Sequence, residues 1–436
     1  MSKFQVTITA LFIIFIIAGV TLFATYKGSS NTTETASINI WGTFPSSVFD
    51  EYISKINSTR SSQLKIDYTE ISESSFDKTF IEALARGRGP DAILVNQDSL
   101  YRHSDKVIPI PFDTLPQRNF QDTFIQQSEL YLTQTGVLAL PFVVDPIVMY
   151  WNRDSFTNAG VSTYPKFWDE FTKLNVDLTQ KDVNSNIRKS AIALGEFSNV
   201  LHAREILGTL FLQSGNSITF KTTNTDDTGI TLSSALGSRN FDGIKTSQPA
   251  LDFFTQFSNP SGANYSWNRS LPSSRSSFLS GNLATYFGFA SEVRDLREKN
   301  PNLNFDVAPM PQARGGKNRA TYGAMYGLSI VRSAVDPLGT FTTLSTLVAP
   351  DALAEMVTAS YLPPVRRDMI GRGSLDLYLS IFYDSALISR GWLDTDKMSS
   401  NNIFRSIVES VTSGKKDSRQ ALQDGSDEYD ILLKSI

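Results

Sequence analysis

The pattern of apolar and polar positions after residue 37 predicts strands and helices in alternation. Ile38 and Ile40 alternate with polar neighbours, as in a strand with one buried face. An apolar stripe at helical spacing follows through 48–56. The same order then repeats, with a strand at 64–68, a helix through 76–84 and a strand at 90–95. Elements of this length and order favour α/β units with parallel strands.

Residues 136–171 predict a place where the chain turns between two strands. An apolar run at 138–142 precedes the pair Asp145-Pro146, and a second apolar run occupies 147–151. Proline lacks an amide hydrogen and biases the preceding residue toward extended geometry, so we expect the pair to break the strand. Two strands that meet end to end at a bend are typical of a chain that passes between two lobes. We therefore interpret this stretch as a hinge.

The remainder of the chain predicts a mixed middle and a helical C-terminal third. Residues 222–242 are polar and contain glycine, which predicts an irregular excursion. The predicted strands are 191–195, 283–287, 305–311 and 325–331, and the predicted helices are 200–212, one from 249, 351–357, 375–387 and 403–411.

The first residues of the chain predict a membrane segment. Val6 to Tyr26 is almost continuously apolar, and no charge lies between Lys3 and Lys27. About 20 apolar residues match the span of a bilayer, so we expect residues 1–27 to form an uncleaved transmembrane anchor. A cleaved signal peptide and burial in a soluble core are the alternatives. Residues 28–36 are small and polar, which predicts a flexible tether.

Composition bounds the remaining possibilities. The chain has 436 residues, 41% of them hydrophobic, which favours two lobes with sizeable cores. A net charge of -4 gives no basic face for nucleic acid. Cysteine is absent, which excludes disulfides and thiolate metal sites. There are 2 histidines, which disfavours a histidine-rich metal site. No nucleophile elbow or phosphate-binding loop is present, and we expect no cofactor.

Several blocks resemble the family 1 extracellular solute-binding proteins, the sugar-type receptors of ABC importers. ALPF, a nearby Asp, MYWNRDSF, AGV and FWDEF stand in the order that this family shows. GPDAILV, FLSGNLATYFGF, FDVAPMP, YGAMYGLSIV and YLPPVRRDM resemble later blocks. Leu138, Arg153 and Phe167 depart from the usual residues of the pattern. The resemblance covers nearly everything after the tether.

The resemblance implies an α/β, two-lobe, periplasmic-binding-protein-like clamp of type II with a hinge. Lobe 1 would comprise residues 37–144 plus 306–350, and lobe 2 would comprise 145–305 plus 351–436. A monomer would bind a carbohydrate or similar polar solute between the lobes and dock on ABC permease subunits. Because a lipid-modified cysteine is impossible, the N-terminal helix would hold the folded part outside the cell membrane. Signal cleavage would instead leave a secreted or periplasmic protein.

Candidate ligand residues lie just after the predicted strands, where open α/β sheets bind ligands. Aromatic rings could stack on sugar rings, and amide or acid groups could bind hydroxyls; each could also pack in the core, form a turn or cap a helix. We expect the ligand-binding set to be Trp41, Thr43, Phe44, Asn96, Gln97, Asp98, Asp145, Glu196, Asn199, Phe289, Tyr322, Met325, Tyr361, Arg366 and Trp392.

We expect no catalysis and no metal on this chain, because no nucleophile with a base partner is recognisable. Two alternatives stay open. One is an extracellular polysaccharide-active enzyme, which needs an acid and a base across a cleft. The other is an anchored sensor or adhesion module with the same fold. Turnover of an oligosaccharide would favour the first, and a neighbouring kinase would favour the second.

Overall fold

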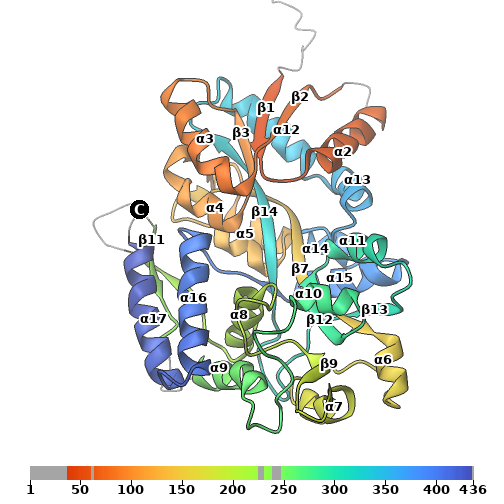
Figure 1. Cartoon of the computed structure of the whole chain (residues 1–436). Coiled ribbons are helices and arrows are strands. Elements are labelled where there is room, and N and C mark those ends of the chain that lie inside the picture. The colour runs from red at the N-terminus through yellow and green to blue at the C-terminus, as the bar shows by residue number, and fades with distance from the viewer. Residues whose placement is uncertain (1–36, 60–62, 224–229, 238–246, 435–436) are drawn as a thin grey trace, which may run out of the picture.

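The computed structural model describes residues 37–59, 63–223, 230–237 and 247–434 (Figure 1). The predicted anchor and tether lie outside the described residues. Within the described ranges, no helix combines the length and the apolar character needed to cross a membrane.

The N-terminal region consists of parallel βαβ units. Its elements are β1 (Ile38–Gly42), α2 (Ser46–Thr59), β2 (Ile66–Glu70), α3 (Glu73–Ala85), β3 (Ala92–Asn96) and α4 (Gln97–Arg102). β1 pairs in parallel with both β2 and β3. The predicted alternation and the parallel pairing are therefore confirmed, although β2 begins two residues later than expected.

Two long strands, β7 (Leu140–Asn152) and β14 (Thr321–Val331), run antiparallel through the middle of the molecule (Figure 1). The predicted break at Asp145-Pro146 is wrong, because β7 is continuous over 13 residues. β7 pairs with β14 up to Pro146, and from Ile147 onward it pairs with β12. Proline is tolerated there because it falls where the strand changes partners.

The lower region in Figure 1 is built on the second half of β7. β12 (Leu283–Phe289) and β13 (Phe305–Ala308) flank β7 antiparallel, and β9 (Ile187–Ile192) runs parallel to β12. Its helices are α6 (Arg153–Asn158), α7 (Glu170–Leu178), α8 (Ala203–Gln213), α9 (Ser247–Thr255), α10 (Ser274–Leu279) and α11 (Glu292–Lys299). Together with β8 (Gln180–Lys181), these strands belong to one 11-stranded sheet within the described residues, with the main order β2-β1-β3-β14-β7-β12-β9-β8.

The C-terminal third is helical, as predicted. It contains α12 (Pro337–Leu347), α13 (Pro350–Ser360), α14 (Arg367–Ile370), α15 (Leu377–Leu387), α16 (Lys397–Thr412) and α17 (Ser418–Leu433). Asp336 caps α12 by accepting a hydrogen bond from Gly339 N at 3.0 Å, next to a proline in the first turn. α16 and α17 pack against each other beside α8 and α9 (Figure 1).

The remaining elements are short. They are β4 (Val107–Ile108), β5 (Ile110–Pro111), α5 (Gln117–Thr123), β6 (Gly136–Val137), β8 (Gln180–Lys181), β10 (Thr219–Thr223), β11 (Ile230–Ser234) and β15 (Ser389–Arg390), with 3-10 turns at Ser104–Lys106, Gln126–Tyr131 and Gln256–Ser258. β10 and β11 form an antiparallel hairpin. The irregular excursion predicted for 222–242 is therefore wrong where these strands pair.

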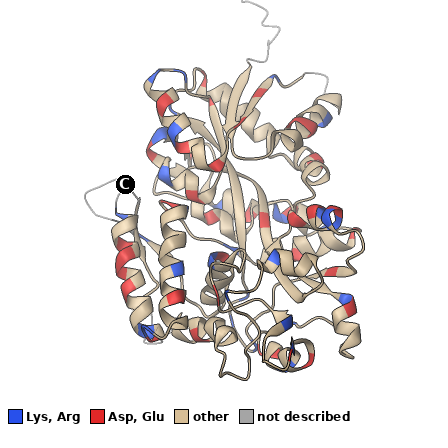
Figure 2. Cartoon of the chain, in the orientation of Figure 1, with Lys and Arg blue, Asp and Glu red and all other residues tan. Residues whose placement is uncertain are grey.

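The central strands are almost free of charge. Every residue of β7 is buried, and Asp145 is its only charged residue, while β14 has none. Lys, Arg, Asp and Glu instead lie mainly on the helices and loops (Figure 2). The shared core on both sides of β7 and β14 thus holds the N-terminal region and the lower region together by apolar packing.

Candidate functional site

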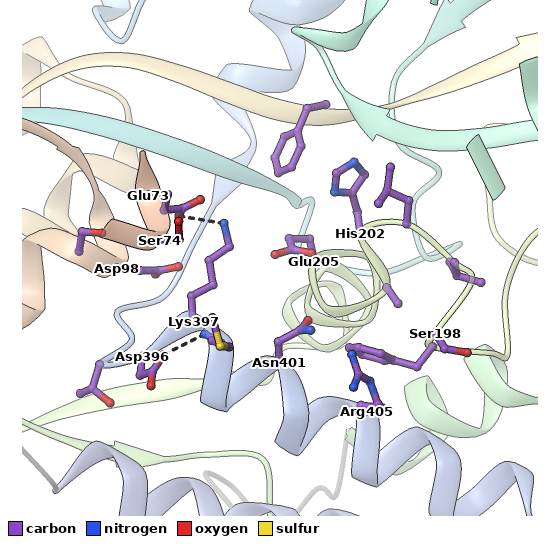
Figure 3. Close-up of a pocket in the computed structure, with 18 of the residues that line it drawn as sticks. Glu73, Ser74, Asp98, Ser198, His202, Glu205, Asp396, Lys397, Asn401 and Arg405 are labelled. Carbon is purple, nitrogen blue, oxygen red and sulfur yellow. Dashed lines mark hydrogen bonds and ion pairs between the residues drawn. The ribbon is translucent and has the colours of Figure 1, made fainter. Parts of the chain in front are cut away.

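A cavity of about 930 Å³ lies between the N-terminal and the lower regions (Figure 3). One wall comes from α3 and α4, with Glu73, Asp98 and Arg102. The opposite wall comes from residues 197–203, Glu205 and the first turns of α16. Sequence segments that are far apart therefore line one space, and both regions of the fold contribute to it.

Helix caps place the polar side chains of this cavity. Asn96 ends β3 and accepts a hydrogen bond from Ser99 N at 3.0 Å, which starts α4 and puts Asp98 in its first turn. Asp396 caps α16 in the same way, accepting a hydrogen bond from Met398 N at 2.9 Å. This places Lys397 at the start of α16, with its ammonium directed into the cavity (Figure 3).

A buried guanidinium lies directly behind the cavity. Arg204 is 1% exposed and forms an ion pair with Asp394, a second with Glu205 at 3.2 Å, and a longer one with Asp98 at 3.8 Å. Its guanidinium also lies over the ring of Trp392, 4.7 Å from the centroid. We call Arg204, Asp98, Glu205 and Asp394 the Arg204 cluster.

The charges of this cluster shift one another's pKa values. Burial raises the pKa of Asp98 to about 7, because it disfavours the carboxylate more than Arg204 favours it. For Arg204, burial acts to lower the pKa, but Asp394, Asp98 and Glu205 outweigh it and raise the pKa overall. The guanidinium thus stays charged, and Asp98 titrates near neutral pH.

One ion pair crosses the cavity. Lys397 Nζ lies 3.2 Å from Glu73 Oε1, so α16 and α3 are joined across the space (Figure 3). Burial lowers the pKa of Lys397, but Glu73, Glu205 and Asp98 have the larger combined effect and raise it. The carboxylates of both walls therefore stabilise a primary ammonium.

Three predicted ligand residues line the cavity: Asp98, Asn199 and Phe289. The amide of Asn199 is already engaged, since it donates to the carbonyl groups of residues 268 and 271 and accepts from Trp267 Nε1 at 3.0 Å. Phe289 is half-buried and meets His202 edge-on, at 4.7 Å between ring centroids. Asp98 and Phe289 are consequently the predicted residues best placed to contact a ligand.

Four predicted residues are buried behind the wall. They are Gln97, Tyr322, Met325 and Trp392. Gln97 Oε1 accepts from Met325 N at 3.1 Å, and Gln97 Nε2 donates to the Tyr322 hydroxyl at 3.4 Å. Trp392 lies against Arg204, and none of the four side chains lines the cavity in this structure.

The N-terminal aromatic pair lies away from the cavity. Phe44 is buried and packs edge-on against Tyr326, at 5.3 Å between ring centroids, so the alternative of core packing describes it. Trp41 is half-buried against the core, and Thr43 lies between Trp41 and Phe44 in the sequence. Asn96 serves as the helix cap described above and donates to Glu73 Oε1 at 2.9 Å.

The other predicted residues have partners elsewhere. Asp145 accepts a hydrogen bond from Ser291 N at 3.1 Å, and Glu196 pairs with Arg269 at 3.3 Å. Tyr361 donates to Asp376 Oδ1 at 2.6 Å, and Arg366 pairs with Asp368 at 3.0 Å. None of these four residues lines the cavity.

The sequence reasoning missed Glu73, Glu205, Lys397 and Asn401, which line the cavity, and Arg204 behind it. The candidate residues were taken from the loops after predicted strands, whereas these residues lie on helices. A signal was present for Arg204 and Glu205, because they interrupt an otherwise apolar run in α8. Among the described residues, no group of His, Asp and Glu is arranged to hold a metal ion.

The sequence profile of the bacterial extracellular solute-binding proteins matches residues 45–339, about two thirds of the chain. The chain belongs to this family. The resemblance drawn from the sequence blocks is thereby confirmed. No curated protein sequence matches this solute-binding protein.

Solved structures show the same fold. The sugar-binding protein MalE from Xanthomonas citri is 19% identical, with 91% of this chain and 97% of that chain covered and a TM-score of 0.69. The cyclic alpha-maltosyl-1,6-maltose binding protein from Arthrobacter globiformis is 14% identical, with 92% and 100% covered and a TM-score of 0.72. CpMnBP1 with mannotriose bound is 20% identical, with 90% and 99% covered and a TM-score of 0.65. The solute-binding protein thus has the α/β periplasmic-binding-protein-like fold.

Proposed function

We propose that this solute-binding protein is the receptor of an ABC importer and binds an oligosaccharide in the cavity between α3, α4, α8 and α16. The observation that carries the proposal is a cavity of about 930 Å³ lined by polar side chains from both regions of the fold. Its volume falls in the range of about 300–1,000 Å³ typical of small-molecule sites. The sugar ligands named for the similar structures support a carbohydrate over other polar solutes.

The proposed mechanism is closure of two lobes around the ligand. Residues 37–144 plus 306–350 would form one lobe, and residues 145–305 plus 351–436 the other. A ligand that contacts both walls stabilises the closed form by its higher affinity for that form. The closed monomer then docks on the permease, and residues 1–27 hold it at the outer face of the membrane. No bond of the solute is made or broken on this chain.

Binding and turnover can be measured together. The full chain in mild detergent would be mixed with mannose-, maltose- and glucose-type oligosaccharides, and its melting temperature would be recorded. We expect a concentration-dependent rise for at least one class, because ligand binding stabilises the native state by mass action. Asn401→Ala, which removes a cavity side chain on α16, should reduce the rise.

Two results would contradict the proposal. A folded sample whose melting temperature no saccharide changes is not a sugar receptor. If chromatography shows that the added oligosaccharide is hydrolysed, the polysaccharide-active enzyme is favoured instead.

A further inference from the structure

The Arg204 cluster contains more negative than positive charge. Asp98 and Glu205 line the cavity with 6% and 7% exposure, and Asp394 is fully buried behind them. Arg204 is the only cation of the cluster, and Asp394 is its nearest partner. One guanidinium is therefore the counter-ion of three carboxylates.

The carboxylate of Asp98 is incompletely paired. Its Oδ1 accepts no hydrogen bond from any described residue. Its Oδ2 lies 3.8 Å from Arg204, beyond the usual length of a charge-assisted hydrogen bond of about 2.7–2.9 Å. A buried carboxylate without a close donor is costly, so a donor on the ligand would stabilise it.

The cavity already stabilises one primary ammonium, that of Lys397. Glu73 contacts it at 3.2 Å, and its charge is favoured further by Glu205 and Asp98. Lys397 and Arg204 together still leave the four carboxylates Glu73, Asp98, Glu205 and Asp394 with two negative charges in excess when all are ionised. The other charged residues that line the cavity, Asp77, Arg102, Asp396 and Arg405, carry two negative and two positive charges and do not change this balance.

The excess negative charge of the cavity favours some classes of sugar over others. A neutral hydroxyl can donate to Asp98 but leaves the excess charge in place, while a uronic acid adds to it. A protonated amine both donates hydrogen bonds and neutralises charge, and it has three N–H groups with which to do so. We propose that the cavity prefers oligosaccharides bearing a protonated primary amine, held against Asp98 and Glu205; this inference rests on the proposed function.

The test compares sugars that differ at one position. Calorimetric titration of the full chain would use β-1,4-linked glucosamine oligomers, their N-acetylated forms and the corresponding glucose oligomers, with malto- and manno-oligomers as further neutral probes. We expect the amine form to bind roughly tenfold or more tightly than the best neutral sugar. Tighter or equal binding of a neutral sugar would overturn the inference and leave the proposed function standing. Binding of none of the sugars would overturn both.

Conservative variants locate the amine. Asp98→Asn and Glu205→Gln keep the side-chain shapes, and we expect each to weaken amine binding about tenfold with a much smaller effect on a neutral sugar. Asp113→Asn is the matched control, since it removes the same charge from an exposed turn outside the cavity. Equal weakening of amine and neutral sugars would overturn the inference. Melting curves without ligand identify any variant that fails to fold, and the sugar comparison on the unmodified chain remains decisive.

Discussion

Asp145 is a carboxylic acid placed in the middle of the strand that joins the two regions of the fold. Burial raises its pKa to about 7, and the hydrogen bonds from Ser291 only partly oppose this. The unfolded chain gives up this proton near pH 4, while the folded chain keeps it until about pH 7. Stability contributed by the protonated form is therefore complete in acid and lost as the pH rises toward 7.

Asp145→Asn should remove this pH dependence, because the amide cannot ionise and can still accept the hydrogen bond. We expect the variant to gain stability relative to the unmodified chain as the pH rises from 4 to 8, by up to about 4 kcal/mol. Urea unfolding at several pH values measures the difference. Asp113→Asn, which alters an exposed carboxylate, should run parallel to the unmodified chain. A constant difference between Asp145→Asn and the unmodified chain would contradict the argument.

At the same scale, the sequence predicted the sheet edge at which a residue lies better than it predicted how deeply the side chain is buried. Of the residues predicted at strand ends, Asp98 and Phe289 lie in the cavity wall. The same rule selected Tyr322 and Trp392, which lie one layer deeper, because strand ends specify an edge of the sheet and not the distance from its surface. Lys397 enters the cavity from a helix of the C-terminal third, a contact that depends on long-range packing and leaves no local pattern.

At the scale of elements, most strands and helices followed from periodicity, and the error at β7 is informative. The rule that proline lacks an amide hydrogen is local, and it does not include the fact that β14 leaves β7 at that residue. Close approach of β14 to its neighbours depends on small residues. A Cβ at Gly327 would lie 2.8 Å from Ala139 Cβ and 2.8 Å from the Tyr131 ring.

Gly327→Ala should therefore destabilise the protein by about 1–3 kcal/mol, because the added methyl group must displace packed side chains. Urea unfolding followed by circular dichroism measures this cost. Gly371→Ala is a suitable comparison, since a Cβ there meets only the carbonyl oxygen of residue 367, at 3.2 Å. Equal stability of Gly327→Ala and the unmodified chain would show that β14 has room to adjust.

At the scale of the whole molecule, the pair of Glu73 and Lys397 connects walls that the proposed lobe boundaries assign to different lobes. Both side chains are partly exposed, at 51% and 44%. Exposed pairs of this kind contribute at most about 1 kcal/mol to stability, yet a contribution of that size is enough to change the populations of open and closed forms.

Lys397→Met removes this bridge and keeps most of the side-chain volume. We expect a larger radius of gyration without ligand, measured by small-angle X-ray scattering, and a change in unfolding free energy below about 1 kcal/mol. Lys299→Met, which breaks the exposed pair with Asp295 within α11, controls for the loss of a positive charge. Identical scattering from Lys397→Met and the unmodified chain would show that the pair does not hold the walls together.

The position of β14 also bears on how the chain is made. β14 lies between β3 and β7, with Tyr326 opposite Asn96 and Leu328 opposite Leu140. The N-terminal strands cannot complete their hydrogen bonding until a segment synthesised much later becomes available. Contacts of such long sequence separation slow folding. A solute-binding protein that has to cross a membrane before it folds would gain from such a delay, because its chain would remain unfolded for longer.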